Sequence, residues 1–397
     1  MAVIVLEEPR RAASPPPAFA LFALGFRPFY LLAAVQALAF VPLWIAVLQG
    51  SLNVPTGMAP MLWHGHEMVF GFACAVIVGF LFTAVRSWTG LATPEGRPLA
   101  ALALLWLAAR LAFFVAPPWL IALLDLALLP VVMLALGSVL IRAKNRRNYF
   151  VLGILAALWL SNLAFHAAQA GWVGASPLLP LHLAVAIISV LETVIAGRIV
   201  PMFTANALRI ETQRRPWLDR AAIALTAASL LGWSLGVPAV WTALLAAPAV
   251  VVQAVRCHGW RPWRTGRTPM LWILHLSHGW IVLALALLAI TPLWPQAAAP
   301  VLHLLTVGAM AGLILGMITR TTLGHTGRMP VAGRAETVMF VLLQLALLTR
   351  LLPPLFAVDW YSAGLRLSAV LWAACFALYV WRYAPMLWRP RIDGRPG

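Results

Sequence analysis

The chain is organised as a series of long apolar segments separated by short polar connections. Twelve segments of roughly 18 to 28 residues can be delimited, each long enough as a helix to cross about 30 Å of hydrocarbon. The runs are too long for barrel strands, and backbone groups in lipid must be hydrogen-bonded internally. The pattern therefore predicts an all-α, polytopic membrane protein with about 12 transmembrane helices. The segments lie near 21–49, 60–86, 99–116, 118–141, 149–171, 178–204, 217–236, 238–256, 269–292, 297–320, 335–356 and 362–387.

Histidine and arginine recur along these segments with a period of about 120 residues, which is typical of internal repeats. Histidines 118 and 121 residues apart lie near the starts of the second, sixth and tenth segments: His64, His182 and His303. Arginines 120 residues apart stand at the entry to the preceding segments: Arg27, Arg147 and Arg267. The spacing predicts three pseudo-repeats of four helices, at about 21–141, 149–256 and 269–387. They would form a single membrane domain over 21–388, between a disordered tail at 1–20 and a second tail at 389–397.

Composition excludes a soluble protein, because 63% of the residues are hydrophobic and only 10% are charged. The net charge of +17 does not indicate nucleic-acid binding, since the basic residues form short loop clusters rather than one stripe. Connections such as 50–59, 171–177 and 292–297 carry no Lys or Arg, whereas the alternate connections carry several each. Positive loops stay in the cytoplasm, so we expect both termini to be cytoplasmic and the lipid bilayer to be the main partner. Arg350 and Arg366 are exceptions to this charge bias.

The histidines are the main candidate chemistry, because a neutral imidazole is a good ligand for haem iron and for copper. The predicted orientation places four of them in the outer third of the bundle, with His166 at the same level: His64, His66, His182 and His303. His275 and His278 are three residues apart on one helix face, so they could chelate a copper ion. His64 and His66 are two apart and point about 200° away from each other, so both face one metal only if the helix unwinds. A lone membrane histidine is also often an interhelical hydrogen-bonding group, and for His166 both interpretations stay open.

Other polar groups inside the predicted helices are candidates for proton transfer or positioning, because ionisable groups at that depth are costly and usually functional. Glu192 could belong to a proton path or partner a metal-bound group. Arg198 is the other catalytic candidate; it lies six residues from Glu192, too far along the helix to pair well with it, and could simply extend toward the cytoplasmic surface. Glu67 could orient a neighbouring imidazole by accepting its second N–H. His258 and His325 fall at the cytoplasmic ends of their helices, where an interfacial role is the simpler interpretation.

Four stretches together resemble the NnrS family: LGFRPFYLLAA at 24–34, WHGHEM at 63–68, AGRIVPMFTAN at 196–206 and TRTTLGHTGR at 319–328. The resemblance implies a bacterial inner-membrane protein that contains haem, taken as type b, and copper, and that is associated with resistance to nitric oxide and nitrosative stress. It also adds His325 and Arg328 as candidate site residues. The stretch from His64 to Phe70 is distantly similar to the second helix of haem–copper oxidase and nitric oxide reductase catalytic subunits. This chain departs from those subunits elsewhere. It has no adjacent His-His pair, and the position four residues after His182 is Ala186 instead of a tyrosine.

Two classes of function follow from these observations. In the first, the protein binds nitric oxide or turns it over as an oxidoreductase served by an unknown electron donor. Its haem ligands would come from His64, His66, His182 and His303, and its copper ligands would be His275 and His278. In the second, it is a proton- or metal-coupled transporter that uses the histidines and Glu192. The repeat units all start on the same side, which argues against the inverted repeats of many transporters.

Overall fold

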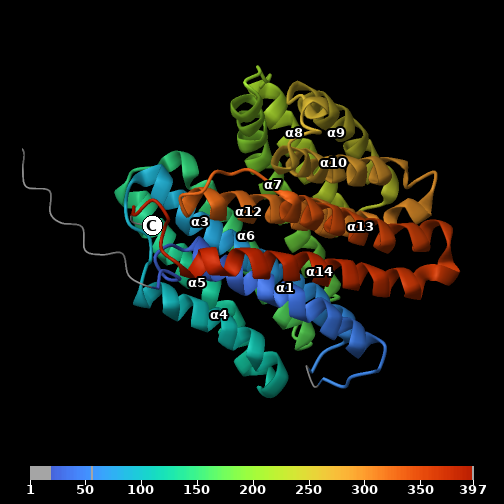
Figure 1. Ribbon diagram of the computed structural model, residues 1–397. Helices are drawn as coiled ribbons and strands as arrows, with labels where there is room; N and C mark the ends of the chain where they lie inside the picture. The colour runs from blue at the N-terminus through green and yellow to red at the C-terminus, as the bar shows by residue number, and fades with distance from the viewer. Residues whose placement is uncertain (1–18, 55–56, 396–397) are drawn as a thin grey trace, which may run out of the picture.

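The computed structural model describes residues 19–54 and 57–395, and this part of the chain is all-α. It forms twelve continuous helical rods, as predicted (Figure 1). Ten are single helices, and the first nine of these along the chain are α1 (Phe26–Leu48), α4 (Arg97–Val115), α5 (Pro118–Arg142), α6 (Phe150–Gln169), α7 (Leu178–Leu208), α8 (Pro216–Ser234), α9 (Ala239–Gly259), α10 (Pro269–Ile290) and α13 (Arg334–Phe356). The last rod is α14 (Tyr361–Trp388). The other two are composite: α2 (Pro60–His66) runs through η1 (Glu67–Ala73) into α3 (Cys74–Thr89), and α11 (Val301–His303) runs through η5 (Leu304–Ala311) into α12 (Gly312–His325).

Eleven of these rods are long and apolar enough to cross a membrane. The chain is therefore a multi-pass membrane protein, which confirms the predicted fold class. The helix α8 is the exception, because Asp219 and Arg220 stand near its start and it carries several small polar residues. The predicted three-unit repeat and the direction of the bundle across the membrane stay predictions.

Short turns join neighbouring rods where the sequence places helix-breaking residues. The rod α4 ends at Val115 and α5 begins at Pro118, whose ring suits the first turn of a helix. Between α8 and α9, Gly236 has φ +69°, in the left-handed region that glycine adopts without strain. Both pairs are helical hairpins, as predicted.

The first and last rods pack side by side, which joins the two ends of the chain (Figure 1). The indole Nε1 of Trp372 donates a hydrogen bond of 2.8 Å to the carbonyl of Ala37. At the other end of α1, Arg27 donates to the carbonyl of Leu387 at 2.9 Å. In Figure 1, α8, α9 and α10 gather on one side of the molecule, while α4 and α5 lie on another.

Each of the two composite rods contains a π-helical stretch directly after a histidine. The segment η1 follows His66, and η5 follows His303. Short π-helical stretches are frequently found at functional sites. Small residues allow close packing there: a Cβ on Gly71 would lie 2.2 Å from Nε2 of Gln36, and one on Gly308 would lie 2.8 Å from the Trp280 ring.

Candidate functional site

The side chains of His64, His182 and His303 line one cavity in the bundle, here called the histidine cavity. They come from three different rods: α2, α7 and α11. The remaining walls come from α1, α13 and α14 and are mainly apolar and aromatic. The structure thus brings the three evenly spaced imidazoles together, while their role as ligands stays a prediction.

Aromatic neighbours orient two of the three imidazoles. The ring of His64 stacks on Trp44 with centroids 3.9 Å apart, and His182 stacks on Trp233 at 4.9 Å. Among the residues that the structure describes, no hydrogen bond reaches a ring nitrogen of His64, His182 or His303. Stacking fixes each ring plane while the nitrogens keep their capacity to bind a ligand.

One cationic side chain, that of Arg350, also lines the histidine cavity. Its Nη1 donates a hydrogen bond to the Tyr361 hydroxyl at 3.2 Å, and its guanidinium lies 5.3 Å from the Tyr361 ring centre. A cation beside three imidazoles favours an anionic group in the cavity. Arg350 was visible in the sequence as an exception to the charge bias, but no site role was predicted for it.

His66 faces the opposite side of its helix, as the two-residue spacing from His64 predicts. Its Nδ1 lies 3.1 Å from Oε1 of Glu67. Its Nε2 lies 3.1 Å from both Oδ2 of Asp125 and Oδ1 of Asn162. His66 is fully buried, so this ring is held on both nitrogens by protein oxygens. The expectation that Glu67 accepts an imidazole N–H fits this contact.

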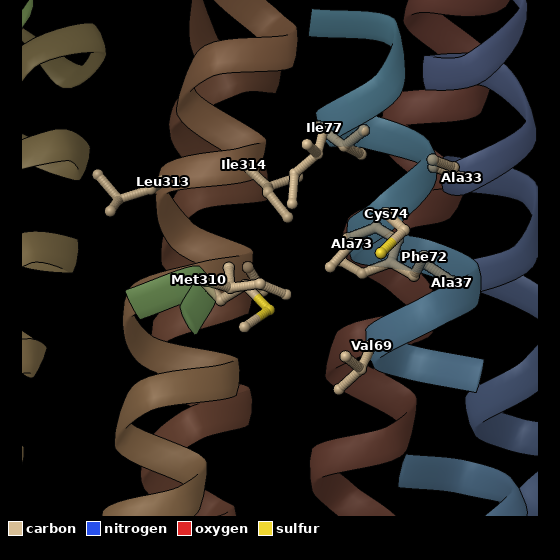
Figure 2. Close-up of a cluster of buried hydrophobic side chains, with 14 of the residues drawn as sticks. Ala33, Ala37, Val69, Phe72, Ala73, Cys74, Ile77, Met310, Leu313 and Ile314 are labelled. Carbon is tan, nitrogen blue, oxygen red and sulfur yellow. The ribbon is translucent and has the colours of Figure 1, made fainter. Parts of the chain in front are cut away.

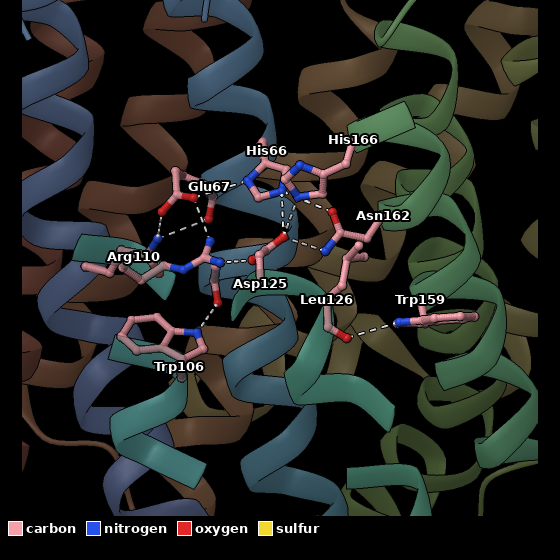
Figure 3. A network of polar contacts seen from close by, with 11 residues as sticks. His66, Glu67, Trp106, Arg110, Asp125, Leu126, Trp159, Asn162 and His166 are labelled. Carbon is pink, nitrogen blue, oxygen red and sulfur yellow. Dashed lines mark hydrogen bonds and ion pairs between the residues drawn. The ribbon is translucent and has the colours of Figure 1, made fainter. Parts of the chain in front are cut away.

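A buried polar network extends from His66 across α2, η1, α4, α5 and α6 (Figure 3). Arg110 donates to Oε1 of Glu67 at 2.6 Å and also pairs with Asp125. His166 Nε2 lies 3.0 Å from Oδ2 of Asp125, and the ring centroids of His66 and His166 are 5.4 Å apart. These contacts place His166 at the level of His66, as its position near the end of the fifth predicted segment indicated. The network also includes Gln36, which donates to Oε2 of Glu67 at 2.9 Å, and Asn162, which donates to Oδ2 of Asp125 at 2.6 Å.

Charge balance gives this network its chemistry. It contains the two carboxylates of Glu67 and Asp125 but only one guanidinium, that of Arg110. Both ring nitrogens of His66 face acceptor oxygens, whereas a neutral imidazole has only one N–H to donate. A further positive charge, either a proton or a metal ion, would balance the site. Three ligand atoms, one each from His66, Asp125 and His166, lie within 4.8 Å of one another. These three residues could therefore hold a metal ion.

Asp125 belongs to this candidate site, although no role was predicted for it from the sequence. It is a lone acid inside the apolar helix α5, and its residue surface is only 6% exposed. An isolated ionisable residue within a membrane segment indicates function by default, so the signal was present.

The protein-family model described as NnrS protein matches residues 20–391 of this chain. The chain belongs to the NnrS family. Among curated proteins, none matches it. The match spans both the histidine cavity and the buried network, so both belong to the NnrS region of the chain.

His275 and His278 of this NnrS protein lie away from the histidine cavity and pack against Trp260, just beyond the end of α9. Oγ1 of Thr204 is 2.8 Å from Nε2 of His275, and Oε1 of Gln253 is 3.3 Å from Nε2 of His278. The Nδ1 atom of His278 is buried and has no hydrogen-bond partner among the described residues. One nitrogen of each ring is therefore engaged by the protein, and His278 keeps one for a ligand.

The remaining predicted residues of this NnrS chain are dispersed. Glu192 lines a second, apolar cavity, and the guanidinium of Arg198 lies 5.0 Å from the Phe150 ring centre. The ring of His325 lies 5.6 Å from that of Phe26, while Arg328 donates to Oγ1 of Thr326 at 2.9 Å.

Arg328 lies outside the membrane-spanning rods, in the connection after α12. Partial burial lowers the pKa of its guanidinium, as do the nearby charges of Arg382 and Arg389. His258 is exposed at the end of α9, in keeping with an interfacial position.

Proposed function

We propose that this NnrS-family protein is a haem- and copper-containing membrane protein that binds or turns over nitric oxide in the nitrosative stress response. The observation that carries the proposal is the histidine cavity, where three imidazoles from three rods face one space without protein hydrogen bonds to their nitrogens. The ring nitrogens of these three histidines stay available to an occupant of the cavity, which supports a ligand-binding role. We place the site in the periplasmic half of a bacterial inner membrane, with both termini in the cytoplasm, because of the Lys and Arg distribution.

The residues around the histidine cavity fit a haem group. Imidazole nitrogens are common axial ligands of haem iron, and the walls offer flat apolar surfaces such as Trp44, Phe72 and Trp372. Arg350 would hold a haem carboxylate by a charge-assisted hydrogen bond. The sequence contains no C-x-x-C-H attachment motif, so the haem would be non-covalent, in keeping with type b. Bound there, the iron would supply the affinity for nitric oxide.

Two places could hold copper. His275 and His278 offer two imidazoles three residues apart on α10. The group of His66, Asp125 and His166 offers three convergent donors, and a metal there would balance the charge of the network. The convergence of three ligand atoms favours the second place over the first.

A proton- or metal-coupled transporter is the second candidate function. The buried network supports it, because membrane transporters use chains of carboxylates and histidines as proton relays. The two candidates differ in one property, since only the first requires a chromophore.

An optical spectrum of the purified protein tests the proposal. We expect a Soret band that shifts when nitric oxide is added and that is lost in the His64→Ala, His182→Ala or His303→Ala variants. The His258→Ala variant is the matched control, because His258 is exposed and does not line the histidine cavity. A colourless preparation that contains neither iron nor copper, from cells supplied with both, would contradict the proposal and leave the transporter.

A further inference from the structure

A second cavity lies between the rods that carry the three imidazoles, and it is here called the Glu192 cavity. It is formed by α3, α7 and α12, together with Tyr30 of α1. These three helices belong to the same rods as His64, His182 and His303. On α7, Glu192 lies ten residues beyond His182, roughly 15 Å along the helix axis. Figure 2 shows the side chains between the two cavities, where Phe72 and Met310 line the histidine cavity and Ile77, Leu313 and Ile314 line the Glu192 cavity.

Among the residues that line the Glu192 cavity, only Glu192 and Tyr30 have polar side-chain groups. Oε2 of Glu192 is buried and has no hydrogen-bond partner among the residues that the structure describes. Tyr30 is fully buried, and its hydroxyl makes no hydrogen bond of ordinary geometry, although Thr321 lies nearby. Burying a polar group without a hydrogen bond costs free energy, and a carboxyl group is among the most costly. An occupant that hydrogen-bonds these groups would remove that cost.

The cavity reaches the surface of the membrane domain. Five of its residues are partly exposed, namely Glu192 and the apolar residues Phe80, Ile195, Ile199 and Met317, and they belong to rods long and apolar enough to cross the membrane. An occupant would therefore enter from the hydrocarbon layer, so it must itself be lipid-soluble. A metal ion needs several ligands, whereas this cavity offers two polar groups. A water molecule could bridge those two groups, but it would leave the apolar walls of the cavity uncovered.

We infer that the Glu192 cavity binds the ring of a lipid-soluble quinone or quinol. Such a ring is flat, neutral and largely apolar, and it carries two oxygen atoms that can hydrogen-bond to a carboxyl and a phenol. A lipid acyl chain has the right polarity for the walls but leaves the Glu192 carboxyl without a partner. In the context of the proposed function, a quinol is a membrane-soluble source of electrons. The role of a quinol as electron donor rests on the proposed function, whereas quinone binding by the Glu192 cavity does not.

The test measures equilibrium binding of decylubiquinone, a short-chain ubiquinone analogue, to the full-length protein in detergent. Quenching of the protein's tryptophan fluorescence reports the binding. We expect saturable binding to the unmodified protein and about tenfold weaker binding to Glu192→Leu, because a hydrogen bond to the ring oxygen is lost. Glu192→Gln keeps a hydrogen-bonding side chain of the same size and should bind within a few-fold of the unmodified protein. Glu211→Leu is the matched control, since it removes an exposed loop carboxyl and should not change the affinity.

Location and chemistry are separated by two further measurements. A photoreactive azidoquinone should label peptides of α7 or α12, and excess decylubiquinone should prevent the labelling. Decylbenzene has the same tail and no ring oxygens, so it should not compete. The inference is overturned if Glu192→Leu binds as tightly as the unmodified protein, or if decylbenzene competes equally, which would indicate a site for acyl chains.

Failure of this inference is distinguishable from failure of the proposed function. A protein that shows a nitric-oxide-sensitive Soret band but does not bind decylubiquinone keeps the proposed function and loses the quinone site. A colourless protein that binds decylubiquinone through Glu192 does the reverse.

Discussion

His66 and Asp125 are 59 positions apart in the sequence, and their side chains meet at 3.1 Å in the interior of the bundle. The same carboxylate also pairs with Arg110 and lies 3.0 Å from His166. Asp125 therefore connects the rods of α2, α4, α5 and α6 through polar contacts. Such contacts are strong in a low-dielectric interior but costly when one partner is missing.

Replacing Asp125 by Asn should destabilise the protein by about 3–5 kcal/mol, because it leaves the buried Arg110 without one of its two carboxylates. The measurement is the thermal unfolding midpoint in detergent. Asp359→Asn is the control, since Asp359 is exposed in the connection before α14, and its midpoint should stay unchanged. Equal midpoints for both variants would show that the network contributes little to stability. If the site holds a metal ion, the Asp125→Asn protein should also retain less metal.

Gly71 tests how tightly the network is packed. A Cβ at this position would lie 2.2 Å from Nε2 of Gln36, the side chain that holds Glu67 at 2.9 Å. Gly71→Ala should therefore displace Gln36 and lower stability by about 1–3 kcal/mol. Gly153→Ala in α6 is the matched control, because a Cβ there meets nothing within 4 Å. That variant should be neutral or more stable by up to about 1 kcal/mol, since alanine favours helices more than glycine. Two midpoints that fall equally would contradict the packing argument.

The helices could be predicted from the sequence because each is a long apolar run, and lipid requires a helix to hydrogen-bond its own backbone. The segment predicted at 60–86 is found at 60–89, and the one predicted at 362–387 is found at 361–388. The π-helical stretches could not be predicted, since apolar residues fill both faces there and no periodicity marks the wider turn. The pairing of α1 with α14 is a tertiary contact that local patterns do not contain.

The candidate site was predictable in part. The 120-residue spacing drew attention to the three imidazoles of the histidine cavity, and the two-residue spacing separated His64 from His66. Asp125 and Arg350 carried a signal as isolated charges in apolar or charge-poor segments. The sequence does not show that Asp125 meets His66, 59 positions away, or that Arg350 lines the same cavity as the three imidazoles. The distant similarity to haem–copper oxidase subunits stays a prediction.

Trp44 should affect haem retention through His64. The two rings stack with centroids 3.9 Å apart, an arrangement worth about 0.5–1.5 kcal/mol beyond the apolar area it buries. Trp44→Leu keeps an apolar wall but frees the imidazole to rotate, so we expect haem affinity to fall about two- to twelvefold. The measurement is haem transfer to an excess of an apoprotein acceptor. Trp119→Leu is the control, because Trp119 is 68% exposed at the start of α5. Unchanged transfer from the Trp44→Leu protein would show that stacking does not position His64 for haem.

Arg350 gives the sharpest test of what the histidine cavity holds. It is a cationic side chain of α13 that lines this cavity. Arg366, near the start of α14, instead donates to Oγ of Ser362 at 2.8 Å and is exposed. Arg350→Gln should weaken haem binding about tenfold or more, because a charge-assisted hydrogen bond to a haem carboxylate is lost. The haem that stays bound should have a lower reduction potential, since removing a nearby positive charge favours the oxidised, more positive iron. Redox titration of the Soret band in both variants measures this shift, and Arg366→Gln should leave affinity and potential unchanged. Equal potentials in Arg350→Gln and the unmodified protein would place the haem away from Arg350, and therefore outside the histidine cavity.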